Sequence, residues 1–282
     1  MRVAVVNTQV PFTRGGAELH ADNLVNALRG CGYEVELVQI PFNWRSPWSV
    51  MDHLMAARMF DLEEVNGKPV DQVIGLRFPA YHVRHSRKVL WIIHQYRSAF
   101  DFWDDPKADL ALQEGGRSVR DAIRVSERKL LGEAAEIFAN SENVKQRLQA
   151  FCNRDSTVLY HPPGLAEDLR LGPYGDYLLC PGRLETLKRQ EFVLNSLAQT
   201  KAQVKIKFVG AVGSESYAEK LKKLAARLGV VDRIEWCGFV SKEALVDLYA
   251  NARAVEAMRR GTCDVMLAGG FDSMINPVGI SG

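Results

Sequence analysis

The sequence predicts an α/β protein built from two doubly wound units, each a parallel sheet with helices on both faces. Short apolar runs alternate with helical patterns through most of the chain, and this order is typical of parallel sheets. The alternation pauses once, at residues 161–174, where three prolines and two glycines predict an interdomain linker. A length of 282 residues also suits two domains better than one.

The first domain is expected over residues 1–160. Its strands are predicted at 3–6, 35–40, 70–74, 89–93, 135–139 and 157–160. Its helices are predicted at 17–28, 47–60, 108–131 and 141–151. Ala21, Val25 and Leu28 share one apolar face of the first helix, and Gly30 with Gly32 ends it. Ser141 is the expected N-cap of the last helix.

The second domain is expected over residues 175–255, where the alternation restarts. Its strands are predicted at 177–180, 204–209 and 233–236, and its helices at 189–197, 217–228 and 241–249. Ligands of doubly wound sheets bind beyond the carboxyl ends of the strands. Functional residues are therefore expected at those ends, in a cleft between the two domains.

Composition excludes several classes of protein. The net charge of +2 gives no strong field for nucleic acid. The five cysteines stand singly, without a Cys-x-x-Cys pair, so neither a disulfide framework nor a zinc site is expected, and a reducing cytoplasmic setting is favoured. No apolar run approaches the ~20 residues of a membrane span, and the chain opens on a strand-like run instead of a signal peptide.

The first candidate site is Gly15-Gly16-Ala17-Glu18, between the first strand and the first helix. Two glycines let a backbone approach a ligand closely, and a helix N-terminus offers N–H groups to an anion. A flexible turn is the alternative interpretation, because the segment lacks the Gly-x-Gly-x-x-Gly pattern of dinucleotide-binding proteins.

The second candidate is His94, at the carboxyl end of the strand predicted at 89–93. A histidine there can donate to a substrate oxygen or phosphate, although a purely structural histidine remains the alternative. The spacing of His82, His85 and His161 suggests no metal site.

The third candidate is the pair Arg183 and Lys188, beside the helix predicted at 189–197. Arg binds a diphosphate bidentately and Lys supplies a point charge. Both cations would stabilise the charge that grows on a departing diphosphate. Two solvated surface charges are the alternative.

The helix predicted at 108–131 is rich in cations. They are Arg117, Arg120, Arg124, Arg128 and Lys129. Such a face can contact a lipid surface or an acidic acceptor. The interleaved Glu114, Asp121, Glu127 and Glu133 favour an ordinary solvated face instead.

These segments together resemble the retaining family-four glycosyltransferases, which have the GT-B fold of two Rossmann-like domains. The resemblance runs from Met1 to about Val255. The segments that carry it most strongly are Gly15-Gly16-Ala17-Glu18, Ala139-Asn140-Ser141, Leu159-Tyr160-His161-Pro162-Pro163 and Gly182-Arg183-x4-Lys188. Phe208-Val209-Gly210, Cys237-Gly238-Phe239-Val240 and Leu248-Tyr249-Ala250-Asn251-Ala252 also fit, and residues 75–81 and 90–95 are similar to a bacterial subgroup.

The resemblance implies an acceptor-binding first domain and a second domain that binds a nucleotide-sugar. It implies that His94, Arg183 and Lys188 are catalytic. It implies substrate binding by Gly15, Gly16, Glu18, Arg183, Lys188, Gly210, Gly238, Phe239, Val240 and Glu256. It further implies transfer with retention, from a nucleoside-diphosphate sugar to a glycan or lipid-linked acceptor, without metal or cofactor.

The end of the chain departs from the family pattern. Beyond Val255 the family has two glutamates in an E-x7-E segment, and only the surroundings of Glu256 resemble the second of them. Residues 256–282 instead resemble an internal piece of a β-ketoacyl synthase. The second domain is therefore expected to be incomplete, followed by an atypical tail.

Four functions are consistent with the sequence. The chain is an active glycosyltransferase, a non-catalytic module that binds a nucleotide or a partner, or a non-functional fusion fragment. A role related to ketosynthases rests on the tail alone.

Overall fold

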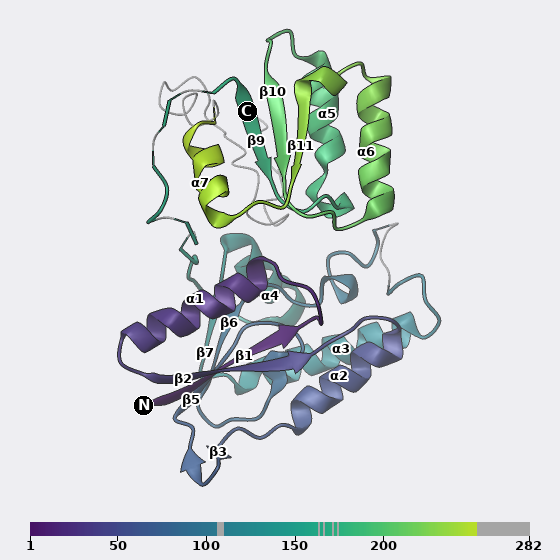
Figure 1. Cartoon of the computed structure of the whole chain (residues 1–282). Coiled ribbons are helices and arrows are strands. Elements are labelled where there is room, and N and C mark those ends of the chain that lie inside the picture. The colour runs from purple at the N-terminus through teal and green to yellow at the C-terminus, as the bar shows by residue number, and fades with distance from the viewer. Residues whose placement is uncertain (106–109, 163, 166, 171, 174, 253–282) are drawn as a thin grey trace. The chain divides into compact units, whose positions relative to one another are not determined.

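The computed structural model describes residues 1–105, 110–162, 164–165, 167–170, 172–173 and 175–252. The chain divides into two compact units, unit 1 from Met1 to Gly164 and unit 2 from Leu165 onward (Figure 1). The division falls within residues 161–174, the segment whose prolines and glycines predict a linker.

Unit 1 is built on one parallel sheet. Its strands are β1 (Arg2–Gln9), β2 (Glu34–Pro41), β5 (Gln72–Gly75), β6 (Lys88–Ile92), β7 (Glu136–Ala139) and β8 (Thr157–Val158). They lie in the order β2-β1-β5-β6-β7-β8, and every neighbouring pair is parallel. A separate ribbon pairs β3 (Glu64–Val65) with β4 (Lys68–Pro69) in antiparallel fashion.

Four helices pack on this sheet. They are α1 (Gly16–Gly30), α2 (Pro47–Met59), α3 (Gly116–Leu130) and α4 (Glu142–Cys152), with short 3-10 turns at Ala80–His82, Arg97–Ala99 and Leu131–Glu133. Side chains alternate between the two faces of a strand, so Ala4 and Val6 of β1 share one face, where they join Ala57 of α2 in a buried cluster. Helix α1 lies on the opposite side of the sheet from α2 (Figure 1).

Unit 2 repeats the arrangement on a smaller scale. Strands β9 (Tyr177–Pro181), β10 (Lys205–Val209) and β11 (Ile234–Gly238) form a parallel sheet in the order β11-β10-β9. Its helices are α5 (Gln190–Gln199), α6 (Glu215–Arg227) and α7 (Lys242–Ala250), with 3-10 turns at Thr186–Lys188 and Val231–Arg233.

The two faces of this sheet carry separate apolar cores. Ile206 and Phe208 point to the face covered by α5 and α6, where Leu194 and Leu221 are fully buried. The opposite face of this sheet is covered by α7 (Figure 1). The predicted α/β class with parallel sheets is thus confirmed in both units.

The helix predicted at 108–131 begins later than expected, at Gly116. Gly115 has a positive φ of 79°, and a Cβ on Gly116 would lie 1.8 Å from the carbonyl oxygen of Leu110. Only glycine fits both conditions. The spacing of the arginines predicts the C-terminal end of this helix correctly, but it does not predict the turn that delays the N-terminal end to Gly116.

The β3–β4 ribbon was absent from the sequence prediction. Its turn is Asn66-Gly67, where both residues have positive φ, as in a two-residue hairpin. The last predicted strand is also shorter, ending at Val158. The expected cap at Ser141 is confirmed, because Ser141 Oγ accepts from Val144 N, and Ser241 Oγ caps α7 in the same way by accepting from Ala244 N.

Candidate active site

The glycine pair lies at the carboxyl end of β1, where α1 begins. Gly15 is the N-cap and Gly16 the first helical residue. The amide of Gly15 donates to Glu18 Oε2 at 2.7 Å, which fixes the turn. A Cβ built on Gly16 meets no atom within 4 Å. The first turn of α1 is therefore anchored by its own carboxylate and still accessible at Gly16.

The Glu18 side chain is buried and bonds to other groups of the protein instead of facing solvent. Its side chain is 7% exposed, and its second oxygen accepts from Arg77 Nη1 at 3.0 Å. Both carboxylate oxygens thus have donors from the protein. In unit 1 this side chain caps Gly15 and holds Arg77, a positioning arrangement that the sequence prediction of direct substrate binding did not contain.

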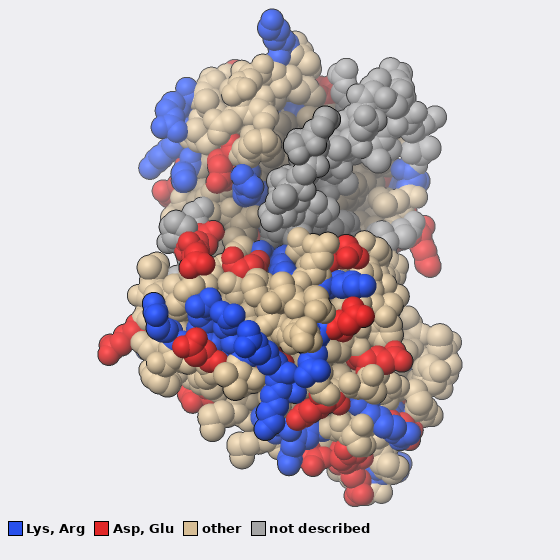
Figure 2. All heavy atoms as spheres, turned by 180° about the vertical axis from the view of Figure 1, so that it is seen from behind, with Lys and Arg blue, Asp and Glu red and all other residues tan. Residues whose placement is uncertain are grey.

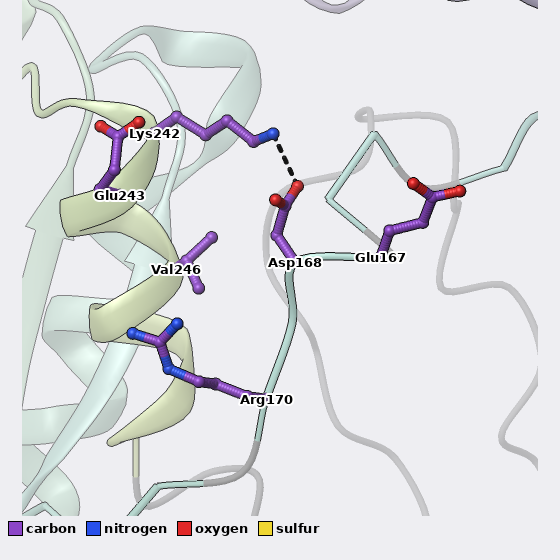
Figure 3. Close-up of a pocket in the computed structure, with 6 residues that line it drawn as sticks. All are labelled: Glu167, Asp168, Arg170, Lys242, Glu243 and Val246. Carbon is purple, nitrogen blue, oxygen red and sulfur yellow. Dashed lines mark ion pairs between the residues drawn. The ribbon is translucent and has the colours of Figure 1, made fainter.

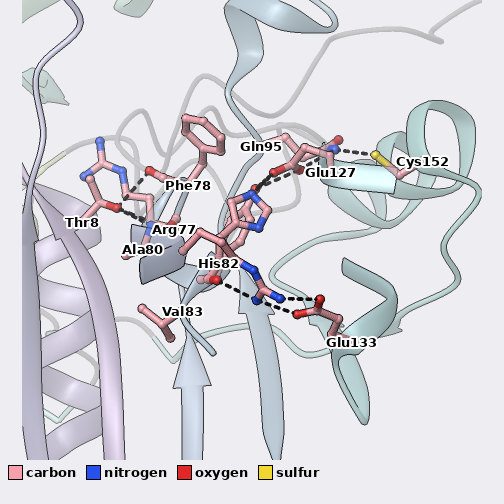
Figure 4. Close-up of polar contacts among 12 residues, drawn as sticks. Thr8, Arg77, Phe78, Ala80, His82, Val83, Gln95, Glu127, Glu133 and Cys152 are labelled. Atoms are coloured by element: carbon pink, nitrogen blue, oxygen red, sulfur yellow. Dashed lines mark hydrogen bonds and ion pairs between the residues drawn. The ribbon is translucent and has the colours of Figure 1, made fainter. Parts of the chain in front are cut away.

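Arg77 is a cation that sequence reasoning missed. It follows β5, so it stands at the same sheet edge as Gly15. Thr8 fixes its segment, because the Thr8 hydroxyl donates to Phe78 O at 2.9 Å and accepts from Ala80 N at 3.2 Å (Figure 4). Its position directly after a strand was the available signal.

His94 follows β6 by two residues and is half-buried. Its Nδ1 lies 2.7 Å from the carbonyl oxygen of Gln95. A carbonyl can only accept, so the neutral ring carries its proton on Nδ1 and its lone pair on Nε2. The imidazole therefore stands at the carboxyl edge of the sheet with a defined tautomer.

A glycine ends each strand of unit 2 or directly follows it. Gly182, Gly210 and Gly238 have φ of 141°, 147° and 66°, a region that favours glycine. Gly182 N donates to Val209 O at 2.7 Å, and Gly210 N donates to Gly238 O at 2.8 Å. A Cβ on Gly210 would lie 2.4 Å from Gly182 O. The three strand ends are thus joined through close backbone contacts.

Arg183 and Lys188 both lie in the connection from β9 to α5. Arg183 is exposed, with one carboxylate, Glu185, 3.5 Å from its Nη2. Lys188 ends the 3-10 turn Thr186–Lys188, whereas the sequence placed it at the helix start. The difference arises because Arg189 adopts a left-handed conformation (φ 54°), which delays α5 to Gln190. Both cations remain at the carboxyl edge of the unit 2 sheet.

The remaining predicted residues lie partly within the described chain. Phe239 and Val240 follow Gly238, and Phe239 is 84% exposed. An exposed aromatic ring at a strand end is available for stacking. Glu256 lies outside the described residues.

The arginine face of α3 is less neutralised than the sequence indicated. Glu127 is fully buried, and Glu133 pairs with Arg58 and Lys88. Among the described residues, neither Arg117 nor Arg124 forms an ion pair with a carboxylate. Glu127 and Glu133 therefore do not neutralise the arginine face of α3, contrary to what their spacing in the sequence predicted. Figure 2, which views the molecule from behind, shows Lys and Arg gathered in a band across unit 1.

An open pocket of about 430 Å³ lies beside α7 (Figure 3). It is lined by Glu167, Asp168, Arg170, Lys242, Glu243 and Val246. Lys242 Nζ pairs with Asp168 Oδ2 at 2.7 Å, and Arg170 pairs with Asp247. Because both cations already have carboxylate partners, this pocket does not fit a phosphate.

Among the described residues there is neither a metal-binding cluster nor a helix suited to span a membrane. No group of three or more His, Cys, Asp or Glu side chains there is arranged to hold a metal ion. Within the same residues, no helix combines the length and apolar character needed to cross a membrane.

Two family models match parts of the chain. Residues 168–262 match the model for group 1 glycosyltransferases, and residues 244–282 match that for the N-terminal domain of β-ketoacyl synthases. The two matches overlap at residues 244–262. In the structure Leu245, Leu248 and Ala252 pack on the unit 2 sheet, so the described part of the overlap belongs to the core of unit 2. No curated protein sequence matches the chain.

Solved glycosyltransferases share the fold. The lipopolysaccharide outer core galactosyltransferase WaaB is 17% identical, with a TM-score of 0.56 over 93% of this chain and 79% of that one. HepE from Anabaena, in complex with UDP-glucose, is 15% identical, with a TM-score of 0.56 over 89% and 72%. A glycosyltransferase from Rickettsia africae is 15% identical, with a TM-score of 0.55 over 89% and 71%.

The fold and the sheet edges thus define an α/β protein of the GT-B type, the two-unit architecture of these enzymes. Within that architecture, the group 1 glycosyltransferase match falls on unit 2. That unit carries Arg183, Lys188 and the three strand-end glycines.

Proposed function

We propose that this protein is a retaining glycosyltransferase that moves a sugar from a nucleoside-diphosphate sugar to a glycan or lipid-linked acceptor. The observation that carries the proposal is the presence of two cations, Arg183 and Lys188, in the β9–α5 connection. This connection lies inside the segment that matches group 1 glycosyltransferases. A uridine diphosphate donor is the first to test, because HepE was solved with UDP-glucose.

The chemistry follows from charge. When the bond between the anomeric carbon and the diphosphate oxygen breaks, negative charge grows on the diphosphate. Arg183 binds two of its oxygens and Lys188 adds a point charge, so both stabilise the transition state more than the bound donor. The glycine ends of β9, β10 and β11 let the nucleotide approach the backbone. Exposed Phe239, next to Val240, offers a ring to the base.

In unit 1, the histidine and the first turn of α1 are the residues proposed to contact substrate. In its Nδ1–H tautomer His94 can accept a proton from a substrate hydroxyl at Nε2, whereas the neutral ring has no proton left for the donation to a substrate oxygen that the sequence predicted. Gly16 offers the first turn of α1, whose N–H groups favour a phosphate. These residues bind and orient, and the two cations of unit 2 supply the charge that a metal would otherwise provide.

The experiment is a transfer assay with a panel of nucleotide-sugars. Arg183→Ala and Lys188→Ala should each lower kcat/KM by about 100-fold, the cost of removing one preorganised charge from a transition state. Lys201→Ala is the matched control, because it removes the same charge between α5 and β10, at the opposite edge of the same sheet. A folded protein that turns over no donor in the panel contradicts the proposal.

A non-catalytic nucleotide-binding module is the second candidate. This alternative is favoured because the β-ketoacyl synthase match over residues 244–282 overlaps the end of the group 1 glycosyltransferase match at residues 244–262. It requires that a nucleoside diphosphate raise the melting temperature without any turnover. Absence of both stabilisation and turnover rejects both functions.

We further propose that unit 1 makes a peripheral contact with an anionic lipid surface through α3. The support is the arginine face, because its neighbours Glu127 and Glu133 are committed elsewhere. Each cation near such a surface contributes ~1 kcal/mol. Vesicles containing phosphatidylglycerol should retain the wild-type protein at low salt, and Arg117→Ser with Arg124→Ser should release it. Equal retention by neutral vesicles contradicts this contact.

The proposed substrate and the four free described cysteines fit a cytoplasmic setting.

A further inference from the structure

A buried polar network connects four segments of unit 1, one of which is the segment that carries His94. At its centre is Glu127 of α3, which is completely buried. Its Oε1 accepts from His82 Nε2 at 2.7 Å, and both oxygens lie 2.9 Å from the Tyr81 hydroxyl. The third segment is the one after β6, where Gln95 Nε2 donates to Glu127 Oε2 at 3.2 Å (Figure 4).

Gln95 has a second anchor in this network. Its Nε2 also lies 3.0 Å from Cys152 Sγ, at the end of α4. The orientation of the amide is determined by its surroundings, because the carbonyl oxygen of an amide cannot face a carboxylate. Both amide protons are therefore committed, one to α3 and one to α4. At 3% exposure, Gln95 has little room to leave this position.

The backbone of the same residue holds the histidine. The carbonyl of Gln95 accepts the Nδ1 proton of His94 at 2.7 Å. Holding the Gln95 amide restricts the direction of this carbonyl, because only ψ and the three side-chain torsions of the same residue connect the carbonyl to the buried amide anchor. The carbonyl in turn decides which nitrogen of His94 carries the proton.

We infer that Gln95, held by Glu127 and Cys152, is a positioning residue that sets the tautomer and direction of the His94 imidazole. The functional part rests on the proposed role of His94 in sugar transfer. The structural part stands alone, because the tautomer is a property of the protein without substrate. Buried hydrogen bonds around a functional histidine commonly orient it in this way.

The other end of the network supplies the matched control. Tyr81 donates to the same carboxylate and is also completely buried, but its hydroxyl bonds to Glu127 and not to the Gln95 amide. Tyr81→Phe removes one donor from Glu127 and keeps the ring. Gln95→Met keeps the length and approximate volume of the side chain but removes both hydrogen bonds that the side-chain amide donates. Each variant removes hydrogen bonding to Glu127 from the same buried cluster, and only Gln95→Met should release the carbonyl that binds His94.

The test is nitrogen NMR of the histidine-labelled full chain at a pH where the rings are neutral, with the His94 signal assigned by its loss in His94→Ala. The wild type and Tyr81→Phe should show the Nδ1–H tautomer. Gln95→Met should show a mixture of both tautomers. In the transfer assay Gln95→Met should lower kcat about 10-fold or more, since small misplacements of a catalytic group are costly. The donor KM should stay within about twofold.

Two outcomes overturn the inference: an unchanged Nδ1–H tautomer in Gln95→Met, or identical tautomer and kcat changes in Gln95→Met and Tyr81→Phe. If Gln95→Met does not fold, Cys152→Ser and Cys152→Ala decide the question. The serine hydroxyl can still accept from the Gln95 amide and should keep the wild-type tautomer, whereas alanine should not. Equal behaviour of these two variants also overturns the inference. A wild type without turnover would reject the proposed function while the NMR result still decides the positioning role.

Discussion

Single residues at the strand ends combine two demands, a stable turn and access for a ligand. At the start of α1, these two demands fall on two different residues, Gly15 and Gly16. Gly15 is fixed by Glu18, while the position of the missing side chain of Gly16 is empty in the fold. A glycine in a helical position without a steric reason costs stability relative to alanine, so its presence at the first turn of α1 favours a role in binding.

Gly16→Ala tests this role. The substitution should leave the melting temperature equal or slightly higher, because a Cβ meets nothing within 4 Å and alanine loses less entropy on folding. Sugar transfer should fall at least about 10-fold, since the Cβ occupies the space through which a phosphate or acceptor reaches the helix N-terminus. Calorimetry and the transfer assay check the two halves. Full activity in Gly16→Ala contradicts the binding role.

His20 is a buried titratable residue outside the candidate site. Its ring contacts those of Trp91 and His161, with centroids 4.4 Å and 5.3 Å away. Burial, and secondarily the nearby His161, lowers the pKa of His20 to about 4. The folded state thus binds the proton less readily than the unfolded state, whose histidine titrates near pH 6.5. The stability contributed by neutral His20 is present above that pH and is lost as the pH falls towards 4.

The expected loss is on the order of 3 kcal/mol between about pH 6.5 and pH 4, from 1.36 kcal/mol for each pKa unit. His20→Phe keeps a ring beside Trp91 and removes the titration, so its free energy of unfolding should depend less on pH across this interval. Urea unfolding followed by tryptophan fluorescence measures the difference. The same pH dependence in His20→Phe and the wild type would show that another group is responsible.

At the scale of elements, the connection from β9 to α5 depends on a neighbouring strand. Gly210, after β10, lies so close to Gly182 that its backbone and that of the β9 end are in contact. The position of Arg183 is therefore a property of two strand ends together, and the sequence of its own segment does not determine it.

Gly210→Ala should disturb this arrangement. A Cβ 2.4 Å from Gly182 O forces the backbone beside Arg183 to move, at a cost of about 1–3 kcal/mol in stability. Binding of a nucleoside diphosphate, measured by titration calorimetry, should weaken about 10-fold or more. Gly229→Ala is the control, because Gly229 also has a positive φ (66°) but meets no atom within 4 Å and follows α6. Equal effects of the two variants on binding would refute the coupling.

Elements were predictable where periodicity is strong. The apolar runs of β1, β6 and β10 and the alternation with helices indicate the fold class correctly. The start of α3 was not predictable from arginine spacing, because its cause is the contact between Gly116 and the Leu110 carbonyl, which only the folded backbone creates. The Asn66-Gly67 turn, by contrast, carried a local signal that identifies a hairpin.

The candidate site was predictable to the level of strand ends. The positions of His94, Arg183 and Lys188 after strands follow from the alternation alone. What the sequence could not provide were the partners, because Glu18 with Arg77 and Gln95 with Glu127 are 59 and 32 residues apart. The acids between the arginines of α3 illustrate the same limit, since sequence spacing does not distinguish a buried glutamate from an exposed one.

At the scale of the whole molecule, each unit has a sheet, its own buried clusters and its own set of candidate residues at the carboxyl edge. Unit 2 carries the proposed diphosphate site, whereas unit 1 carries the glycine turn and the histidine. This division predicts that a nucleoside diphosphate without sugar or acceptor protects primarily the edge of unit 2.

Hydrogen exchange on the full chain tests this division. Addition of UDP should slow exchange in the segments 182–188 and 238–240, because ligand binding suppresses local opening where it makes contacts. The β3–β4 ribbon around Asn66-Gly67 should exchange as before, since it belongs to a separate two-stranded sheet in unit 1. Arg183→Ala should abolish the protection at both segments and leave the ribbon unchanged. Protection confined to unit 1, or protection that survives in Arg183→Ala, would place the diphosphate elsewhere than the β9–α5 connection.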